Sequence, residues 1–365
     1  VRINVNPNER YTIRKLSRIV EDKGLRHFIT VEDTASSLLK EGSPFDVNAL
    51  NNERNRIASY LRNNGYFMFN KEDIRFTADT SFNSTEVDVA MKLKLHQKDG
   101  RTEAKDHKQY TLRNIIFHAD IPSTNDRVDT TAIGNYIFLS NGQMHFRKNL
   151  LISNSLMKPG NLYNDDMMKR TYTNFTRLPA ISYTSINMEE EGGDDSLDCH
   201  ITINHALPHS FGFDVEATNS AGDMGAALST SYQNKNLFRG SETFMFKIRG
   251  AYEAITGLDG YEGNNYTELG AEASLGFPSF LLPYVKRTWG ILHNASSEIN
   301  LQYNMQNRPE FHRRVFTAAW RYKWSSKNQR TQHKFDLAEI NYVYMPWISK
   351  TFKEQYLDSL GRTNA

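Results

Sequence analysis

Hydrophobic and polar positions follow different patterns in the two halves of the chain. Up to about residue 205, segments with helical spacing are mixed with segments in which every second residue is apolar. Apolar residues at i, i+3, i+4 and i+7 indicate one buried helix face, whereas strict alternation indicates a half-buried strand. Further along, the helical spacing disappears, and aromatic residues and glycines become dense. We therefore place the main domain boundary near Leu207 and Pro208.

The first module is expected over residues 9–97, and its second helix is the best-defined element. Asp46 is a good N-cap, because its carboxylate can accept hydrogen bonds from the free amides of the first turn. Gly65 is expected to stop the helix, since a left-handed position after a helix strains residues that carry a Cβ. One strand before the helices and two after them give the order β-α-α-β-β. The predicted elements are a strand over 11–20, helices over 34–40 and from 46 to 64, and strands over 74–78 and 86–95.

The same order recurs over residues 107–205, with the charged segment 98–106 as a linker. A recurrence after about 95 residues predicts two copies of one supersecondary unit. The predicted elements of the second copy are a strand over 110–118, helices over 149–157 and 166–177, and strands over 181–189 and 197–204.

Strict alternation governs the second half, in segments of about ten residues, the length that crosses a bilayer at a tilt. The clearest segment is 299–306, where apolar residues alternate with Asn and Gln. The apolar faces are uncharged, and the polar faces hold amides and charges of both signs, as a wet barrel interior would. A soluble β-domain would instead need a second sheet to cover the apolar face. The residues expected to face lipid are Leu301, Tyr303, Trp320 and Tyr322.

A glycine, a Phe-Asp pair and a Gly-Tyr step frame the second helix of the first module. They are Gly42, Phe45, Asp46, Gly65 and Tyr66. This pattern resembles the motif of POTRA domains, and Pro159-Gly160 and Tyr163 in the second module are similar to it. Leu178-Pro179-Ala180 departs from it, because POTRA domains usually have a glycine and an aromatic residue after this helix. The other interpretation is an unrelated pair of α+β domains.

Two runs in the second half, 218–225 and 231–242, resemble the start of a bacterial surface-antigen barrel. In that family the second run is a short periplasmic turn. Further similar stretches are 270–273 with 277–283, 306–310 and 339–343. Over essentially its whole length the chain thus resembles the BamA/TamA superfamily of outer-membrane assembly barrels. Within it, the TamA-like TamL proteins of Bacteroidetes-type bacteria are more similar than BamA itself.

The resemblance implies α+β POTRA modules followed by the N-terminal strands of an antiparallel transmembrane β-barrel, incomplete in this chain. About seven strands cannot close such a barrel, so we expect an internal piece of a longer polypeptide. The expected division is 1–8 as the end of a preceding POTRA module, 9–97 and 107–205 as POTRA modules, 207–350 as about seven barrel strands and 351–365 as the start of an extracellular loop.

The function that the resemblance implies is assembly or translocation at the bacterial outer membrane, with the POTRA modules in the periplasm. The modules would receive a TamB-like periplasm-spanning partner or a client, and outer-membrane protein clients and lipid remain equally open as cargo. In this family the first and last barrel strands form a weak seam that opens for client strands. The residues of that seam in this chain are Phe211, Gly212, Phe213, Asp214, Val215, Glu216 and Ala217.

No catalytic, cofactor or metal site is expected from the motifs. The sequence lacks G-x-S-x-G, H-E-x-x-H, Walker and C-x-x-C patterns. His200 and His205 near Cys199 read as ordinary surface and edge histidines, and the acidic run 189–195 as a hairpin loop. A net charge of +2 with interspersed signs gives no case for nucleic acid. The alternative function is a POTRA-fused outer-membrane barrel enzyme of the phospholipase type, with its catalytic domain outside this chain.

Overall fold

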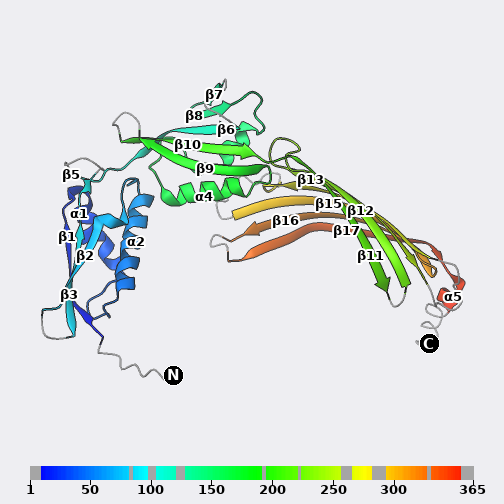
Figure 1. Ribbon diagram of the computed structural model, residues 1–365, viewed down its shortest axis with the longest axis horizontal. Helices are drawn as coiled ribbons and strands as arrows, with labels where there is room; N and C mark the ends of the chain where they lie inside the picture. The colour runs from blue at the N-terminus through cyan, green and yellow to red at the C-terminus, as the bar shows by residue number, and fades with distance from the viewer. Residues whose placement is uncertain are drawn as a thin grey trace.

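Two α+β modules and one long antiparallel sheet follow one another along the chain. Figure 1 shows them from one end of the molecule to the other, with the strands of the sheet curving away from the second module. The computed structural model describes residues 10–81, 85–97, 104–120, 128–190, 195–220, 223–255, 265–281, 293–326 and 330–354. In these ranges, no helix combines the length and the apolar character that crossing a membrane requires. The segment 1–8 and most of 351–365 lie outside the described residues.

The first module is a three-stranded sheet with helices packed on it. Its elements are β1 (Thr12–Val20), α1 (Lys23–Thr30), α2 (Val47–Asn63), β2 (Ile74–Asp79) and β3 (Glu86–Leu93). The central strand β3 pairs in parallel with β1 and antiparallel with β2. A two-stranded piece, β4 (His96–Gln97) with β5 (Ala104–Lys105), leads out of the module.

The first helix lies earlier than the sequence predicts. We expected it over 34–40, but α1 occupies Lys23–Thr30 and only a 3-10 turn follows, over Glu32–Ser36. The physical reason is the cap at Asp22, whose carboxylate accepts a hydrogen bond from the Leu25 amide at 3.0 Å. Leu25 and Ile29, four residues apart, then bury one helix face in the core.

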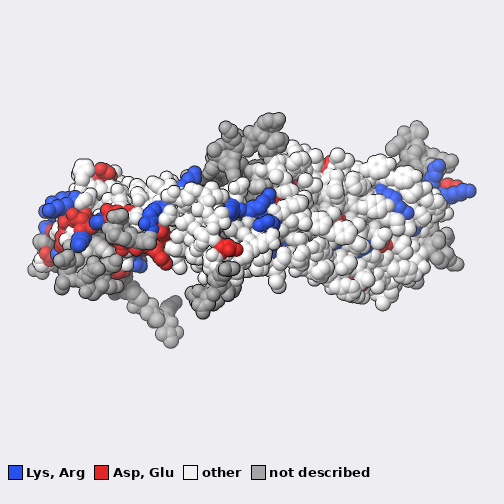
Figure 2. Space-filling view, turned by 90° about the horizontal axis from the view of Figure 1, so that it is seen from above, with Lys and Arg blue, Asp and Glu red and all other residues white. Residues whose placement is uncertain are grey.

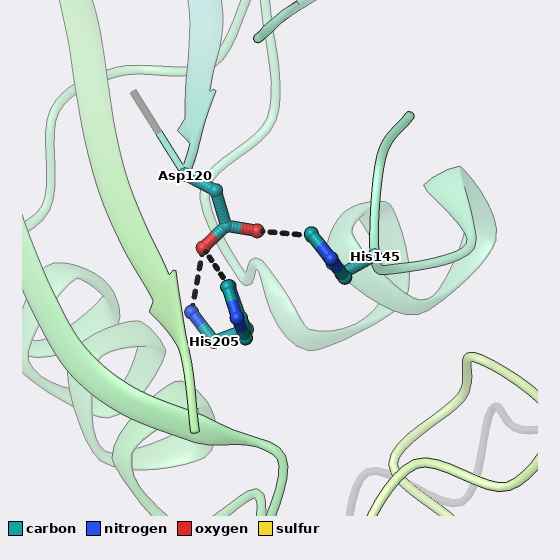
Figure 3. Close-up of side chains that lie close together, drawn as sticks. All are labelled: Asp120, His145 and His205. Carbon is teal, nitrogen blue, oxygen red and sulfur yellow. Dashed lines mark hydrogen bonds and ion pairs between the residues drawn. The ribbon is translucent and has the colours of Figure 1, made fainter. Parts of the chain in front are cut away.

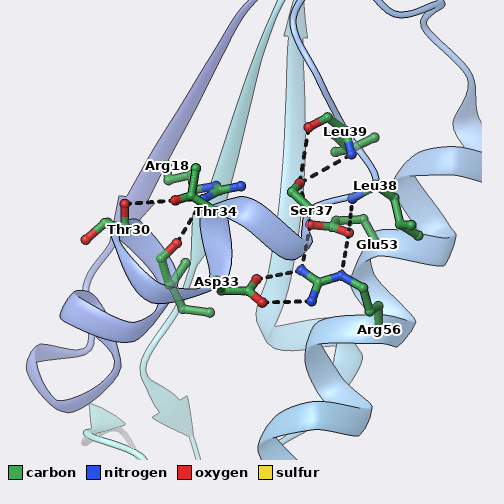
Figure 4. A network of polar contacts seen from close by, with 10 residues as sticks. Arg18, Thr30, Asp33, Thr34, Ser37, Leu38, Leu39, Glu53 and Arg56 are labelled. Atoms are coloured by element: carbon green, nitrogen blue, oxygen red, sulfur yellow. Dashed lines mark hydrogen bonds and ion pairs between the residues drawn. The ribbon is translucent and has the colours of Figure 1, made fainter.

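A buried charge network holds the 3-10 turn against α2. Arg56 on α2 donates to Asp33 at 2.7 and 2.5 Å and to Glu53 at 2.8 Å, while Ser37 donates to Glu53 at 2.7 Å (Figure 4). Both carboxylates are nearly inaccessible to solvent. Burial raises the pKa of Glu53, but the bonds from Arg56, the Leu38 amide and Ser37 outweigh it and leave the pKa below its usual value. The network therefore has a structural role in this module.

The second module repeats this plan with an additional hairpin. Its elements are β6 (Thr111–Ala119), β7 (Asp129–Ile133), β8 (Tyr136–Ser140), α3 (Lys148–Asn154), α4 (Asp165–Thr176), β9 (Ile181–Glu190) and β10 (Ser196–His205), in the sheet order β7-β8-β6-β10-β9. The hairpin β7–β8 is absent from our sequence prediction. Its signal is the Gly134-Asn135 turn between two runs rich in β-branched and aromatic residues. Cys199 on β10 is fully buried, and burial raises the pKa of its thiol.

The loop before the second helix marks the repeat most clearly. In the first module the Gly42 amide donates to the Ile13 carbonyl, and in the second the Gly160 amide donates to the Leu112 carbonyl, both at 2.7 Å. The two glycines have φ values of 81° and 82°. The structure thus places equivalent loops against the first strand of each module.

The joint between the modules is made at the end of α2. Arg62 donates to Asp165 at 2.9 Å and to the Tyr163 hydroxyl at 3.1 Å, and the Tyr110 amide donates to the Gly65 carbonyl at 2.9 Å. Burial raises the pKa of Asp165, but the bonds from Lys169, Arg62 and Tyr163 outweigh it and bring the pKa to about 2. The Asp165 carboxylate is therefore charged, and its ion pair with Arg62 fixes the second module to α2 of the first.

The seven-stranded sheet is an antiparallel meander in sequence order. Its strands are β11 (His209–Ser220), β12 (Asp223–Asn234), β13 (Thr243–Ala254), β14 (Tyr266–Phe277), β15 (His293–Asn307), β16 (Phe311–Ser325) and β17 (Gln332–Ile348). A short helical turn, α5 (Lys350–Phe352), follows. Among the described strands of this sheet, β11 and β17 form the two edges.

Strand register places the seven apolar runs on one face of the sheet. Directly opposed residues lie on the same face, and Leu301 is opposed by Ala273 on one side and by Ala318 on the other. The same row continues to Ile340 on β17, and every neighbouring pair of strands is aligned in this way. Arg314, opposite Met305 near one end of β16, brings a charge to this face. We call the face that carries the aligned apolar runs the apolar face.

The opposite, polar face carries cross-strand charge pairs. Arg249 bonds to Glu216 at 2.9 Å and also to Glu268 at 3.3 Å. Arg321 contacts Glu298 and Asp336, and Lys323 contacts Glu298. The reason is register: Arg321 lies opposite both Glu298 and Asp336.

Candidate functional site

The turn between β12 and β13, residues 235–242, is held in an unusual backbone conformation. Arg239 and Ser241 have φ values of 62° and 60°, in the left-handed region that residues with a Cβ rarely adopt. Asn236 accepts a hydrogen bond from the Ser241 amide at 3.0 Å, and the Gly240 amide donates to Glu242 at 2.8 Å. Strain of this kind persists only where the surroundings enforce it, and it concentrates at functional sites.

This turn meets the loop that precedes α3 in the second module. The Arg239 guanidinium donates to the Met144 carbonyl at 2.6 Å, and the Asn236 side-chain amide donates to the His145 carbonyl at 2.9 Å. The Arg147 amide donates to the Arg239 carbonyl at 2.8 Å, and the Arg147 side chain forms an ion pair with the buried Glu242. Hydrogen bonds to three backbone carbonyls and one ion pair to a carboxylate thus tie the sheet to the second module.

Gly240 is required here because Arg147 and Glu242 pass directly beside it. A Cβ at this position would overlap the Arg147 guanidinium and the Glu242 carboxylate. A side chain would therefore force the ion pair apart or distort the turn.

The end of α4 contacts the same turn. The Ala180 amide donates to the buried Ser241 hydroxyl at 3.0 Å. Leu178 and Ala180 are buried, and Leu178 closes the helix by donating to the Phe175 carbonyl. The departure Leu178-Pro179-Ala180 thus occurs where the second module faces the sheet, whereas Gly65 in the first module faces another module.

A cleft of about 240 Å³ opens between these elements. His209 at the start of β11 lines it and bonds through Nδ1 to the Tyr232 hydroxyl at 2.9 Å. The remaining lining comes from the end of β10, the loop before α3 and the turn: Gln143, Met144, His145, His205, Ala206, Pro208, Asn234, Asn236 and Arg239.

The predicted seam strand lies next to this cleft and is the first edge of the sheet. Phe211, Phe213 and Val215 are 80%, 69% and 72% exposed. Asp214 accepts from the Ser229 hydroxyl at 3.1 Å, and Glu216 pairs with Arg249. Gly212 and Ala217 lie opposite Ser231 and Ala226.

Of the four residues expected to face lipid, three are accessible and one is covered. Leu301 and Tyr303 are 44% and 41% exposed, and Trp320 is half-buried. Tyr322 is only 2% exposed, so our expectation of an open surface is wrong at this position. The ring of Phe280 lies 5.2 Å from that of Tyr322, whose hydroxyl donates to the Leu281 carbonyl.

The predicted motif residues of the first module have structural roles. Gly42 makes the loop bond described above, and the Phe45 amide donates to the Tyr11 carbonyl at 2.7 Å. Asp46 caps α2 by accepting from the Asn48 amide at 2.8 Å. Gly65 has a φ of 98° directly after the C-cap, and the Tyr66 amide donates to the Leu61 carbonyl. The cap assignments made from the sequence are confirmed.

The histidine pair singled out in the sequence is not brought together. His200 instead bonds to His118 at 2.9 Å, and burial together with this neighbour lowers the pKa of His118. His205 lies against Asp120 and His145, a group that the sequence analysis missed. The part of the acidic run over 191–194 falls outside the described residues.

The described residues thus form two α+β modules joined to a seven-stranded antiparallel meander. No family model and no curated protein matches the chain. BamA from Haemophilus ducreyi lacking POTRA domains 1–3 aligns with 14% identity and a TM-score of 0.46, over 91% of this chain and 63% of its own length. CdiB from Acinetobacter baumannii aligns with 10% identity and a TM-score of 0.36, over 94% and 64%.

A third solved structure consists of POTRA domains alone. POTRA3–5 of Haemophilus influenzae BamA aligns over 55% of this chain and 100% of its own, with 12% identity and a TM-score of 0.21. The solved structures that align with this chain are thus BamA, CdiB and POTRA-domain structures. The chain spans 63% and 64% of the lengths of the BamA and CdiB structures.

Proposed function

We propose that the chain is part of an outer-membrane protein that assists the assembly or translocation of other molecules, of the TamL type within the BamA/TamA superfamily. The seven strands would form the first part of its transmembrane barrel, which the present chain leaves incomplete. The observation that carries the proposal is the register of the seven strands, which aligns their apolar runs on one face. In hydrocarbon, an unpartnered amide costs on the order of a few kcal/mol, so this face and not the polar one suits lipid.

The distribution of charged residues also supports the proposal that the sheet, and not the modules, lies in the membrane. Figure 2 shows Lys, Arg, Asp and Glu gathered over the first module at one end, whereas the face of the sheet in this view carries few of them. The two modules, as POTRA domains, would then extend into the periplasm. They would receive a TamB-like partner or a client along a sheet edge, which is how such modules bind extended segments.

Strand β11 is the proposed site where a client strand pairs with the sheet. The proposed role is non-enzymatic, because pairing of strands requires no bond to be made or broken. Among the described strands, β11 pairs with β12 only, so its other side offers backbone donors and acceptors. Lipid cannot satisfy those groups, whereas another strand can. A client protein and a lipid both remain candidate cargo.

The test is site-specific photocrosslinking in the full-length protein in vesicles during the folding of an outer-membrane barrel client. A photoreactive residue at Phe213 on the edge strand should crosslink to the client. The matched control is Phe246, which lies on the same face but on the interior strand β13. Crosslinking of both positions alike would contradict the seam, and a parallel lipid-transfer assay between vesicles distinguishes lipid cargo from protein clients.

A further inference from the structure

Three side chains from distant parts of the second module converge beside the cleft. Asp120 follows β6, His145 lies in the loop before α3, and His205 ends β10. His145 Nδ1 lies 2.9 Å from Asp120 Oδ2, and His205 Nδ1 lies 2.8 Å from Asp120 Oδ1 (Figure 3). One nitrogen from each imidazole and one carboxylate oxygen all lie within 4.8 Å of one another.

The carboxylate of this group is fixed by the backbone around it. Asp120 has a φ of 55°, which a residue with a Cβ adopts only at a cost. Its amide donates to the Ile203 carbonyl at 3.0 Å, and its Oδ1 accepts from the His205 amide at 2.6 Å. The parallel pairing of β6 with β10 brings the two strand ends together. The carboxylate is thus oriented toward both imidazoles.

The two imidazoles lie side by side next to the carboxylate of Asp120. Their ring centroids are 4.1 Å apart with an angle of 20° between the planes. The His145 and His205 side chains are 50% and 38% exposed, so an ion can reach them from solvent. A carboxylate only accepts hydrogen bonds, so each Nδ1 holds a proton in this arrangement.

Two imidazoles and a carboxylate are a ligand set suited to divalent transition metals, Zn²⁺ in particular. Ligand atoms at about 2.1 Å from a tetrahedral Zn²⁺ lie about 3.4 Å apart. The observed 2.8 and 2.9 Å separations run to different oxygens of Asp120, Oδ1 for His205 and Oδ2 for His145. One ligand atom from each of the three residues lies within 4.8 Å of the other two, so small side-chain rotations would bring three ligands around one ion. Each imidazole would ligate through Nδ1 once its proton has moved to Nε2.

A second group of histidines and a carboxylate in the same module does not have the geometry of a metal site. His118 Nε2 lies 2.9 Å from His200 Nδ1, and Glu189 lies 3.4 Å from His200 Nε2. His118 and Glu189 therefore contact opposite nitrogens of one ring, and a single ion cannot bind all three. The two groups have similar composition, but only one has the geometry of a site.

We propose that Asp120, His145 and His205 form a binding site for one divalent transition metal ion of the Zn²⁺ type at the junction of the second module and the sheet. The ion would link three segments of the module, and the His145 carbonyl already accepts from Asn236 of the turn. Metal binding would thereby hold the turn 235–242 and the start of β11 in a fixed relation to the second module.

The test uses the full-length protein in detergent, without a polyhistidine tag and stripped with a chelator. Zn²⁺ is titrated in competition with a chromophoric chelator, and Co²⁺ is added separately to record its visible absorption. We expect one site per chain, and at least about 10-fold weaker binding in His145→Ala and in Asp120→Asn. His118→Ala is the matched control and should bind like the parent.

A thermal measurement on the same samples guards against a variant that simply unfolds. Zn²⁺ should raise the melting temperature of the parent and of His118→Ala, because an ion that binds only the folded state stabilises it. It should not raise that of His145→Ala, whose melting temperature without metal should stay near that of the parent. Absence of Zn²⁺ binding at micromolar concentration in the parent, or equal binding by His145→Ala, would overturn the site.

Discussion

Strands alternate apolar and polar residues in both the modules and the seven-stranded sheet, yet the apolar side meets different surroundings. In β3 of the first module, Val87, Val89, Met91 and Leu93 are at most 2% exposed, because helices and neighbouring strands cover them. In β11, Phe211 and Val215 are 80% and 72% exposed. Alternation therefore identifies a strand. Whether a helix or another strand covers its apolar face decides if that face is buried in a protein core or stays exposed.

The largest effect follows from separating the two regions. Residues 9–205 should fold alone into two soluble α+β modules, because each module buries its own core. Thermal unfolding followed by circular dichroism, with an NMR spectrum of the isolated segment, checks this. A segment that aggregates or shows a single merged domain would break the comparison.

Within the sheet, neighbouring positions on opposite faces should respond differently to charge. Leu301→Arg should cost about 2–4 kcal/mol if the residue lies near the bilayer midplane, whereas Gln302→Arg on the polar face should be nearly neutral. Refolding titrations of the full-length protein in lipid vesicles measure both. Equal costs would mean that the orientation is wrong, and two harmless substitutions would mean that these strands do not cross a membrane.

In the modules, a smaller effect is expected where a helix ends. Gly65→Val should destabilise the first module by roughly 1 kcal/mol or more, because φ is 98° there and a β-branched residue resists it. An added Cβ would also lie 3.3 Å from Gln109 and Leu162. Urea unfolding of residues 9–205 gives the free energy.

Gly65→Asn serves as the control for this position, since asparagine tolerates the left-handed region better than other residues with a Cβ. It should lose less stability than Gly65→Val. Identical melting temperatures for the valine variant and the parent would count against the cap.

The smallest expected effect is a pH dependence at His107. Its Nδ1 lies 2.8 Å from Asp22 and its Nε2 lies 3.3 Å from Asp73. Burial lowers the pKa of His107, but the hydrogen bonds to both carboxylates outweigh it and leave the pKa raised. The stabilisation is therefore complete below the ordinary histidine pKa of about 6.5, and it is lost as pH rises through the raised value.

Asp22 limits this stabilisation on the acid side. Burial raises its pKa, but the bonds from His107 and Leu25 outweigh it and leave the pKa lowered, so its contribution is lost as pH falls through that value. Residues 9–205 should thus lose stability as pH rises above the ordinary histidine pKa of about 6.5 and through the raised pKa of His107. His107→Gln should flatten this slope and the exposed His27→Gln should leave it unchanged; the opposite result would rule out the assignment.

Local patterns predicted those parts of the fold that depend on neighbours in sequence. The caps at Asp46 and Gly65 and the faces of all seven sheet strands follow from spacing, because a strand has a side-chain period of two residues. The hairpin β7–β8 was missed although its Gly-Asn turn is a recognisable signal. The first helix was misplaced because the Asp22 cap went unnoticed.

The junction could not be predicted in the same way. Asp120 lies 25 residues from His145 and 85 from His205. The parallel pairing of β6 with β10 brings Asp120 beside His205, and the loop before α3 adds His145. The contacts of Arg147 and Ser241 likewise join segments 95 and 61 residues apart. Pairing between distant strands leaves no trace in local hydrophobic spacing.

The buried thiol of Cys199 has a practical consequence for studying this protein. It is the single cysteine of the sequence, and burial both shields it and disfavours the reactive thiolate. Cys199 should therefore not react with maleimide probes as long as the second module stays folded. A cysteine introduced at 301, 302 or 213 would report its own solvent access without a prior substitution, and labelling of Cys199 would itself report the opening of β10.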